Sequence, residues 1–158
     1  MKNRVTVERK SDRELVVTRT FDAPARLIFE AWSKPELFRR WWLPRSMGMT
    51  LVSYEADIRT GGSYRIEISH QGSKPMAFFG TYLEVTPHSR IVWTNEESPD
   101  GPVTTMTLEE KGGKTLLVLS ELHPSKEALD AAGTGALDAM GETFGQLDEL
   151  IAELGAGG

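Results

Sequence analysis

The spacing of hydrophobic residues along this chain changes from one segment to the next. Residues 15–21 are rich in β-branched side chains, which is typical of a strand. Apolar side chains then recur three and four positions apart up to about residue 43, at every second position in residues 49–122, and again at helical spacing after residue 125. The pattern predicts a strand, two short helices, a long series of strands and a C-terminal helix.

Three prolines delimit the two short helices. Pro24 is expected in the first turn of one helix, where its missing N–H is not needed. Pro35 starts the second helix and Pro44 ends it, because proline cannot continue a helix. This second helix is expected to carry Trp41 and Trp42 on one side. The two helices would form a corner without a basic recognition surface.

Turn-rich segments divide the region after residue 49 into short stretches of alternating side chains. Tyr64 and Ile66 alternate with Arg65 and Glu67, which puts the two sets on opposite faces of one strand, the polar set toward water by the usual rule. The turns between stretches predict antiparallel hairpins. The expected strands are residues 49–57, 64–68, 76–85, 91–95, 103–109 and 115–122, in addition to residues 15–21, which can extend back into residues 5–7.

The C-terminal helix has the most regular pattern. Its apolar stripe consists of Leu137, Met140, Phe144, Leu147, Ile151 and Leu154. Gly141 and Gly145 lie one turn apart beside this stripe, although each glycine costs about 1 kcal/mol relative to alanine. Two interpretations stay open: sheet side chains pack into the notch left by the glycines, or the notch leaves room for a ligand. A short turn or helix is expected at residues 125–132.

The length of 158 residues suits one domain. We expect residues 1–158 to form it, with a core at about 14–154, an arm at 1–12 and a frayed tail at 155–158. The order of elements predicts an α+β fold in which a curved antiparallel sheet of about six or seven strands wraps around the long C-terminal helix. Such a sheet touches the helix along its middle, so a cavity can lie between them at the ends.

Charge and composition argue against several functional classes. The net charge is −5 and the 18 Lys and Arg residues are scattered, so we expect no nucleic-acid partner. The absence of cysteine excludes disulfides and thiolate sites and fits a reducing compartment. No apolar run reaches the roughly 18 residues of a membrane span, and the polar N-terminus does not resemble a signal peptide. These features predict a cytoplasmic protein; its oligomeric state stays open.

Six short motifs occur in an order and at spacings that resemble a known superfamily. They are Phe21-Asp22-Ala23-Pro24, Ala31-Trp32-x-x-Pro35, Trp41-Trp42-x-Pro44, Asp57-x-Arg59-x-Gly61-Gly62-x-Tyr64-Arg65, Gly80-x-Tyr82-x-Glu84-Val85 and Arg90-Ile91-Val92. Together they resemble the SRPBCC, or START-like, superfamily over about residues 14–154. More narrowly, they are similar to its branch related to the activator of the heat-shock-protein-90 ATPase.

The resemblance implies the helix-grip fold, with two short helices after the first strand. It also implies functional alternatives, because START-like relatives include polyketide cyclases and dehydratases and because this branch takes its name from a chaperone partner. Two features depart from the family pattern. Met140-Gly141 stands near the place where members often carry Gly-Trp. Co-chaperone members also carry a separate N-terminal domain, which we do not expect in the dozen residues before the first strand.

Residue types that commonly carry catalysis lack the necessary spacing. His70, His88 and His123 lie at strand ends or in a turn and are expected to face solvent, and none has metal-ligand spacing. No serine lies in a nucleophile elbow, and no glycine pair belongs to a phosphate-binding loop. The Asp57-to-Gly62 segment is interpreted as a turn in which Asp57 caps amides or pairs with Arg59. We therefore expect no catalytic residue, metal or cofactor.

Aromatic and methionine side chains are the best candidates for the wall of a cavity, since they form a deformable apolar surface. The candidates are Trp32, Trp42, Met47, Tyr64, Phe79, Trp93, Met106, Met140 and Phe144. Each of them is also compatible with an ordinary core. Charged residues that could contribute to a hydrated cavity are Glu30, Arg65, Glu67 and Glu121.

Three functional hypotheses follow. The first is noncatalytic binding of a hydrophobic small molecule between the sheet and the last helix. The second is an enzyme similar to polyketide cyclases and dehydratases, which would require a titratable side chain buried in the cavity beside a second polar group. The third is a partner that stimulates a chaperone ATPase, which rests on the family resemblance alone.

Overall fold

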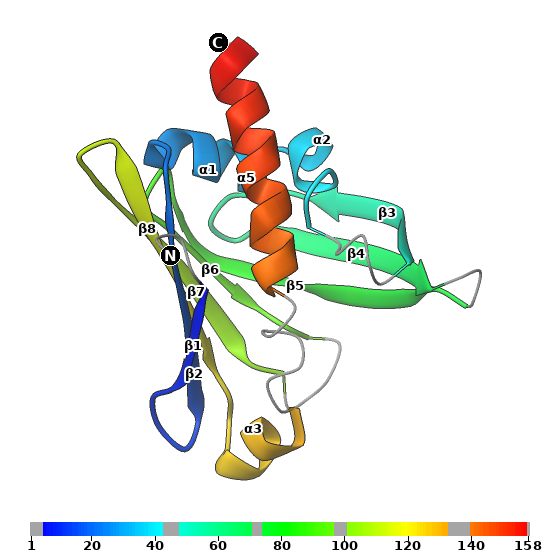
Figure 1. Ribbon diagram of the computed structural model, residues 1–158. Helices are drawn as coiled ribbons and strands as arrows, with labels where there is room; N and C mark the ends of the chain where they lie inside the picture. Colours follow the sequence, from blue (N-terminus) through cyan, green and yellow to red (C-terminus); the bar gives the residue numbers. More distant parts are fainter. Residues whose placement is uncertain (1–4, 43–47, 71–73, 97–100, 133–139, 158) are drawn as a thin grey trace.

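One curved antiparallel sheet forms the body of the molecule (Figure 1). The computed structural model describes residues 5–42, 48–70, 74–96, 101–132 and 140–157. The sheet has eight strands in the order β1-β2-β8-β7-β6-β5-β4-β3. The strands are β1 (Thr6–Arg9), β2 (Glu14–Phe21), β3 (Met49–Ala56), β4 (Ser63–His70), β5 (Met76–Thr86), β6 (Arg90–Thr94), β7 (Val103–Lys111) and β8 (Lys114–Leu122).

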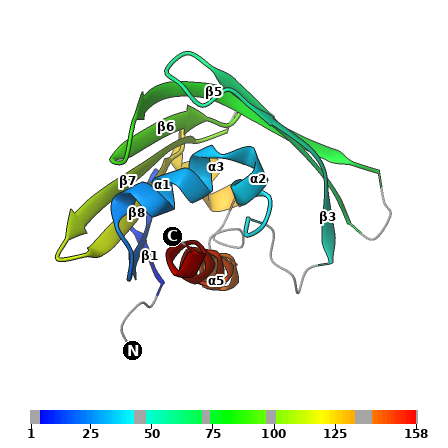
Figure 2. The same cartoon turned by 90° about the horizontal axis from the view of Figure 1, so that it is seen from above.

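In the described part of the chain, four helices pack against or beside this sheet. They are α1 (Ala25–Ser33), α2 (Pro35–Phe38), α3 (Lys126–Ala132) and α5 (Met140–Gly157). The view along α5 shows that the sheet curves around this helix, while α1 and α2 lie across one end (Figure 2). Helix α3 lies at the opposite end, beyond the first turn of α5 (Figure 1). This arrangement confirms the predicted α+β helix-grip fold.

The structure corrects the prediction at the N-terminal end of the chain. Residues 1–12 were expected to be an arm, but Thr6–Arg9 forms β1 and pairs with β2 from Thr6↔Thr18 to Arg9↔Leu15. The sheet therefore has one strand more than the six or seven expected. The physical reason is that β2 pairs with β8 along only one of its edges, and β1 satisfies hydrogen-bonding groups on the other edge.

The second short helix is also shorter than predicted. Helix α2 ends at Phe38, whereas helical spacing had suggested that it continues toward Pro44, which lies outside the described residues. Trp41 sits in the turn that follows, and its indole Nε1 donates a hydrogen bond to the carbonyl oxygen of Ala31 at 3.0 Å. The amide of Gln146 in α5 donates to the carbonyl oxygen of Trp41 at 2.8 Å. The corner is thereby attached to both α1 and α5.

The face of the sheet that α5 covers is called the inner face below. On β2 and β8 it carries Leu15, Val17, Leu117 and Leu119, which are at most 2% exposed. The rings of Phe21 in β2 and Phe144 in α5 meet edge to face, with centroids 5.5 Å apart. Alternation of buried and exposed residues along the strands puts the remaining side chains on an outer face.

Gly141 and Gly145 do not receive side chains from the sheet. Gly141 is exposed and Gly145 is half-buried. No described atom lies within 4 Å of the place where a Cβ would stand at either position, apart from the local helix backbone and neighbours left out of that comparison. The notch is therefore not filled by any described side chain of the sheet.

The Asp57-to-Gly62 motif forms a turn, as predicted. The Asp57 carboxylate accepts a hydrogen bond from Nε of Arg59 at 2.7 Å. Gly61 has φ +90°, a conformation that favours glycine. A Cβ at Gly62 would lie 1.9 Å from the carbonyl oxygen of Asp57. This part of the family pattern thus serves the geometry of the β3–β4 connection.

Candidate functional site

His123 is buried at the end of β8, although it was predicted to face solvent. It is only 2% exposed. Its main chain is held by Arg13, whose carbonyl oxygen accepts from the His123 amide at 2.8 Å and whose Nε donates to the His123 carbonyl oxygen at 2.9 Å. Neither imidazole nitrogen has a hydrogen-bond partner among the described residues. Burial lowers the pKa of the imidazole and favours its neutral form.

Glu121 lies two residues earlier, on the inner face. It is paired with Leu15 on β2 and with Thr104 on β7, and its side chain is 23% exposed. Burial raises the pKa of its carboxyl group. Its Oε1 is 3.6 Å from Nε2 of His123, which is longer than a hydrogen bond. Two titratable groups thus lie side by side in a poorly solvated place without bonding each other directly.

Further polar side chains continue from Glu121 across the neighbouring strands. Thr104 is 2% exposed, and its hydroxyl accepts a hydrogen bond from the amide of Asn95 at 3.0 Å. The Tyr64 hydroxyl donates to the Thr94 carbonyl oxygen at 2.7 Å and lies 3.4 Å from the amide oxygen of Asn95. The set Tyr64, Asn95, Thr104, Glu121 and His123 is called the polar belt below. It runs from β4 to the end of β8.

Gly80 allows two strands to approach closely beside the polar belt. A Cβ at this position would lie 2.1 Å from the carbonyl oxygen of Thr94, the same oxygen that accepts from Tyr64. The Thr94 hydroxyl accepts from the amide of Thr81 at 2.9 Å. The absence of a side chain at Gly80 therefore permits the contact between β5 and β6 that places Thr94 and Asn95.

An aromatic wall adjoins the polar belt. Trp93 pairs with Thr104 in the β6–β7 register and is half-buried on the inner face. Its ring centroid is 6.1 Å from that of Trp32 in α1, and Trp32 lies 5.0 Å from Trp41. Trp42 stacks on Phe38 at 5.3 Å. The structure therefore brings the tryptophan-rich corner into contact with the inner face next to the belt.

Two of the predicted cavity residues are completely buried. Met106 and Phe144 are both 0% exposed. Met106 pairs with Leu119 on the inner face, and Phe144 packs on Phe21 beneath α5. These side chains belong to the packed interior.

Three other predicted residues lie on the outer face of the sheet. Arg65 pairs with Phe79, and its guanidinium lies 5.7 Å from the centre of the Phe79 ring. Glu67 contacts Ser53 and Arg65, each at 3.3 Å. Tyr64, Ile66 and Ile68 occupy the inner face of the same strand, so alternation sends Arg65 and Glu67 outward. These three residues are thus separated from the polar belt by the sheet.

The remaining predictions are less closely tied to the belt. Glu30 is half-exposed on α1. Met47 and the side chain of Met140 lie outside the described residues.

Tyr54 on β3 and Tyr82 on β5 were not among the predicted site residues, although Tyr82 belongs to one of the family motifs; Tyr82 is buried and Tyr54 is half-buried. The hydroxyls of Tyr54 and Tyr82 hydrogen bond each other, and burial raises the pKa of Tyr54 to about 12 and that of Tyr82 still further. The Tyr82 ring lies 5.6 Å from the Tyr64 ring. Both phenols are neutral near neutral pH, and they add two hydroxyl groups to the polar side chains on the inner face.

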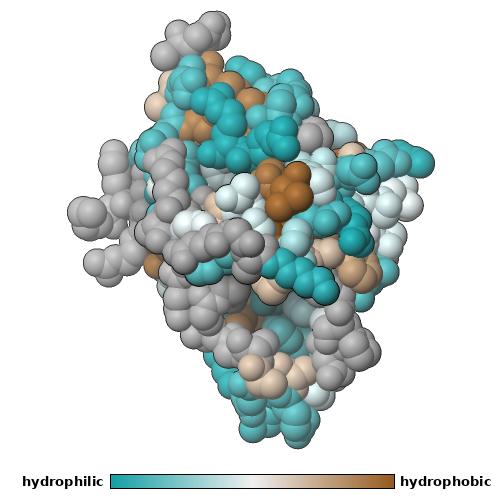
Figure 3. Space-filling view, turned by 90° about the vertical axis from the view of Figure 1, so that its right-hand side faces the viewer, coloured by the Kyte–Doolittle hydropathy of each residue, from teal (hydrophilic) through white to brown (hydrophobic). Residues whose placement is uncertain are grey.

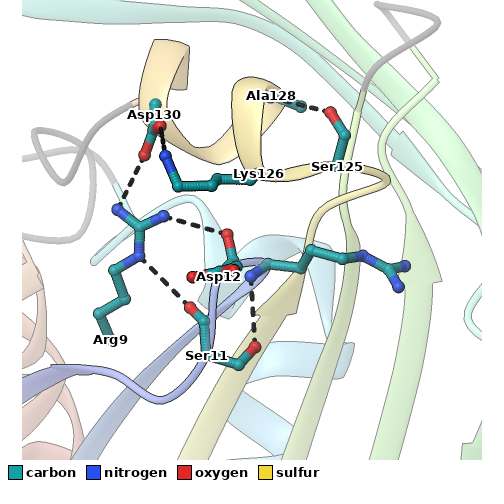
Figure 4. A network of polar contacts seen from close by, with 8 residues as sticks. Arg9, Ser11, Asp12, Ser125, Lys126, Ala128 and Asp130 are labelled. Atoms are coloured by element: carbon teal, nitrogen blue, oxygen red, sulfur yellow. Dashed lines mark hydrogen bonds and ion pairs between the residues drawn. The ribbon is translucent and has the colours of Figure 1, made fainter.

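Helix α3 lies at the end of the molecule where the polar belt finishes. Arg9 of β1 forms an ion pair with Asp130 at 2.9 Å, and Lys126 reaches the other carboxylate oxygen at 2.9 Å (Figure 4). The Ser125 hydroxyl caps the helix by accepting from the Ala128 amide at 3.0 Å. These contacts connect the segment after His123 to the β1–β2 turn.

Sequence alternation contained a signal for the pair that prediction missed. Leu117 and Leu119 are buried, and Glu121 and His123 continue the same phase at every second position. The prediction that His123 faces solvent rested on its position at the end of a strand. The strand phase alone could not show its burial, because that depends on how the chain continues into α3 after β8.

The arrangement provides neutral hydrogen-bonding groups and two candidate proton carriers, not a recognisable metal centre. Among the described residues no cluster of three or more His, Asp or Glu is placed to hold a metal ion. No helix in the described part is long and apolar enough to cross a membrane.

The side of the molecule at the β3 edge is mainly hydrophilic, with small separate hydrophobic areas and a hollow in its lower half (Figure 3).

Solved structures of several bacterial proteins have the same fold. A Rhodobacter sphaeroides protein is 22% identical with a TM-score of 0.86, covering 96% of this chain and 99% of its own. A Nitrosomonas europaea protein is 20% identical with a TM-score of 0.82, covering 94% and 99%. A Staphylococcus epidermidis protein is 28% identical with a TM-score of 0.75, covering 94% of each chain.

Comparison at the level of families gives a match over most of the sequence. No functionally curated protein matches the chain. Residues 22–152 match the family described as "Activator of Hsp90 ATPase homolog 1-like protein", which agrees with the motifs and with the helix-grip fold. The chain therefore belongs to the activator of Hsp90 ATPase homolog 1-like family.

Proposed function

We propose that the protein binds a hydrophobic small molecule against the inner face of the sheet, at the end that carries the polar belt. Membership of the family is compatible with ligand binding or with a chaperone-activating role. The observation that favours a ligand is that Trp93 and Glu121 are only half-buried on the inner face, although Met106 and Leu119 beside them are fully buried. An aromatic surface beside a few polar groups is the usual composition of a small-molecule site.

The position of the proposed site follows from how α5 covers the sheet. Met106 and Phe144 are fully buried, so the middle of the interface is occupied by protein side chains. Trp93 and Glu121 both pair with Thr104, on either side of β7, and the Trp93 ring also contacts Trp32 of α1. We therefore place the ligand beside Trp32, Trp93 and Tyr64, with Trp42, Met47 and Met140 as further candidates for its wall.

A retained ligand would provide the most direct test. Native mass spectrometry of protein purified from its own host should show an adduct that disappears after denaturation. A panel of lipids and flat aromatic compounds should then raise the melting temperature of the stripped protein, because a ligand that binds only the native state stabilises it. No adduct together with no stabilisation across the panel would contradict the proposal.

Two alanine variants locate the site. Trp93→Ala removes the half-buried inner-face ring and should abolish ligand-induced stabilisation. Phe79→Ala removes an aromatic ring from the outer face of β5 and should leave the ligand-induced stabilisation unchanged. Equal losses in both variants would argue against the inner face as the binding site.

A second candidate function is acid–base catalysis on the bound molecule, similar to that of cyclases and dehydratases. It is favoured by the juxtaposition of Glu121 and His123, at 3.6 Å, in a desolvated place. In a dehydration, neutral His123 would take the proton next to a carbonyl while protonated Glu121 gives its proton to the leaving hydroxyl, so that a C=C bond and water form. Turnover of a β-hydroxy ketone that is lost in both Glu121→Gln and His123→Gln would support it; turnover that survives both changes would exclude these roles.

A further inference from the structure

We infer that Glu121 and His123 together bind a hydroxyl group, so that the ligand is a hydrophobic alcohol or phenol. This inference rests on the proposed function, because the hydroxyl belongs to a molecule held against the inner face. It adds a chemical class and two recognition residues to that proposal.

His123 has hydrogen-bonding capacity that the described part of the protein does not use. A neutral imidazole offers one donor and one acceptor, and both ring nitrogens are buried without a partner. Buried polar groups are almost always hydrogen bonded, because desolvation without a partner is unfavourable. In the part of the chain that the structure describes, the Glu121 carboxyl lies 3.6 Å from the ring, which is too far for a hydrogen bond, so a further group is needed to satisfy the imidazole.

The separation of the two side chains suits one bridging oxygen atom. Glu121 Oε1 and His123 Nε2 are too far apart to bond each other, but an oxygen placed about 2.8 Å from each would bond both. The Glu121 side chain is 23% exposed and the His123 side chain 3%, so a molecule that approaches from solvent meets the pair at Glu121.

The protonation preferences of the pair select the chemical class. Burial favours neutral His123 and raises the pKa of Glu121, so both groups resist a charged state. A hydroxyl is neutral and can donate to one group while it accepts from the other. A carboxylate would place a second acidic group beside the Glu121 carboxyl, whose own charged form burial already disfavours.

The rest of the polar belt does not compete for the same hydroxyl. Asn95 donates to Thr104 and to the carbonyl oxygen of Pro102, at 3.0 and 2.7 Å. Tyr64 donates to the carbonyl oxygen of Thr94. These groups are occupied with one another, and the unused capacity is concentrated at His123.

A series of bicyclic aromatic probes with different substituents tests the inference. The probes are 2-naphthol, naphthalene, 2-naphthoate and 2-naphthylamine, with dissociation constants from isothermal titration calorimetry. We expect 2-naphthol to bind about 10-fold more tightly than naphthalene, which corresponds to about 1.4 kcal/mol, and more tightly than the naphthoate or the amine. The imidazole nitrogen signals of His123, assigned by comparison with His123→Gln, should shift with 2-naphthol and not with naphthalene.

Substitutions of the pair separate hydroxyl recognition from apolar binding. Glu121→Leu and His123→Leu should remove the preference for 2-naphthol and retain naphthalene binding. Glu109→Leu, at an exposed position of β7, is the matched control and should retain the preference. Should His123→Leu fail to fold, Glu121→Leu and the histidine signals of the wild type still give the answer.

Each result points in a definite direction. Naphthalene binding without a preference for 2-naphthol would overturn the hydroxyl inference and leave the proposed function intact, as expected if only water bridges the pair. Tighter binding of 2-naphthoate would overturn it in the same way and indicate an anionic ligand, and tighter binding of the neutral 2-naphthylamine would overturn it in favour of an amino group. If the retained-ligand and panel experiments above also show no binding, the proposed function fails and the hydroxyl inference fails with it.

Discussion

Individual polar side chains on the inner face differ in how they are compensated. Arg19 is 7% exposed, but both of its terminal nitrogens contact the Asp148 carboxylate, and its guanidinium lies over Phe21 at 4.5 Å. Thr104 is bonded to Asn95. The His123 ring has no such partner in the described part of the chain. Arg19 keeps one unpartnered buried nitrogen, Nε, but its charge is compensated, whereas neither nitrogen of the His123 imidazole has a partner among the described residues, which makes His123 the candidate for ligand contact.

Glu121→Gln should make the protein more stable, relative to wild type, as pH rises. Folding raises the pKa of Glu121, so the folded state holds this proton more tightly than the unfolded state. The resulting stabilisation is present below the ordinary glutamate pKa and is lost as pH rises through the folded pKa. Urea unfolding at about pH 4 and about pH 8 measures the difference. Glu109→Gln controls for the lost charge, and an equal trend in both variants would contradict the assignment to Glu121.

Gly80→Ala should destabilise the protein by about 1–3 kcal/mol. The added Cβ would lie 2.1 Å from the Thr94 carbonyl oxygen, so β5 and β6 would have to move apart. Chemical unfolding followed by tryptophan fluorescence gives the change in free energy. Gly141→Ala is the control, because its Cβ meets no described atom outside the local helix and should be neutral or stabilising. Unchanged stability in Gly80→Ala would show that the two strands can separate at no cost.

Helix α5 is the element that connects the two ends of the fold. Asp148 binds Arg19 of β2, Gln146 holds the carbonyl oxygen of Trp41, and Glu153 forms an exposed ion pair with Arg40 at 2.7 Å. Apolar packing beneath the helix provides the larger stabilisation, whereas the polar contacts fix its rotation and axial position. The exposed pair is expected to contribute little, because solvent screens it.

Asp148→Leu should destabilise the protein by about 1–3 kcal/mol, because Arg19 is left buried without a counter-charge. The effect stays below that of a fully buried pair, since Asp148 is 40% exposed. The double variant Arg19→Met with Asp148→Leu should recover much of the loss, as no charge then remains buried. Additive losses in a double-mutant cycle would show that the two side chains act independently.

The whole molecule consists of a sheet that curves around one helix, with a helical corner at one end and α3 at the other (Figures 1 and 2). Because α5 supplies Phe144, Leu147, Leu150 and Ile151 to the buried set, the sheet alone would expose its inner face. Only the assembled molecule brings α1, β6 and β8 around one site. The proposed ligand site is therefore a property of the closed fold.

Deletion of residues 140–158 should abolish cooperative unfolding. The truncated chain would expose the apolar inner face and should bind a hydrophobic dye, while the near-ultraviolet circular dichroism of its aromatic residues weakens. Glu149→Ala, on the exposed side of α5, should retain both the cooperative transition and the aromatic signal. A cooperative transition in the truncated chain would show that the sheet is stable without the helix.

The sequence alone determined the order of elements, the phase of β4, the turn at Asp57 to Gly62 and the family, because these depend on local spacing and short motifs. It did not determine that Thr6–Arg9 pairs with β2, since an edge strand depends on what its neighbour leaves unpaired. Only the tertiary structure put Phe79 on the outer face and buried His123 beside Glu121. Burial is set by elements distant in sequence, so no local pattern could decide which polar groups would lose water.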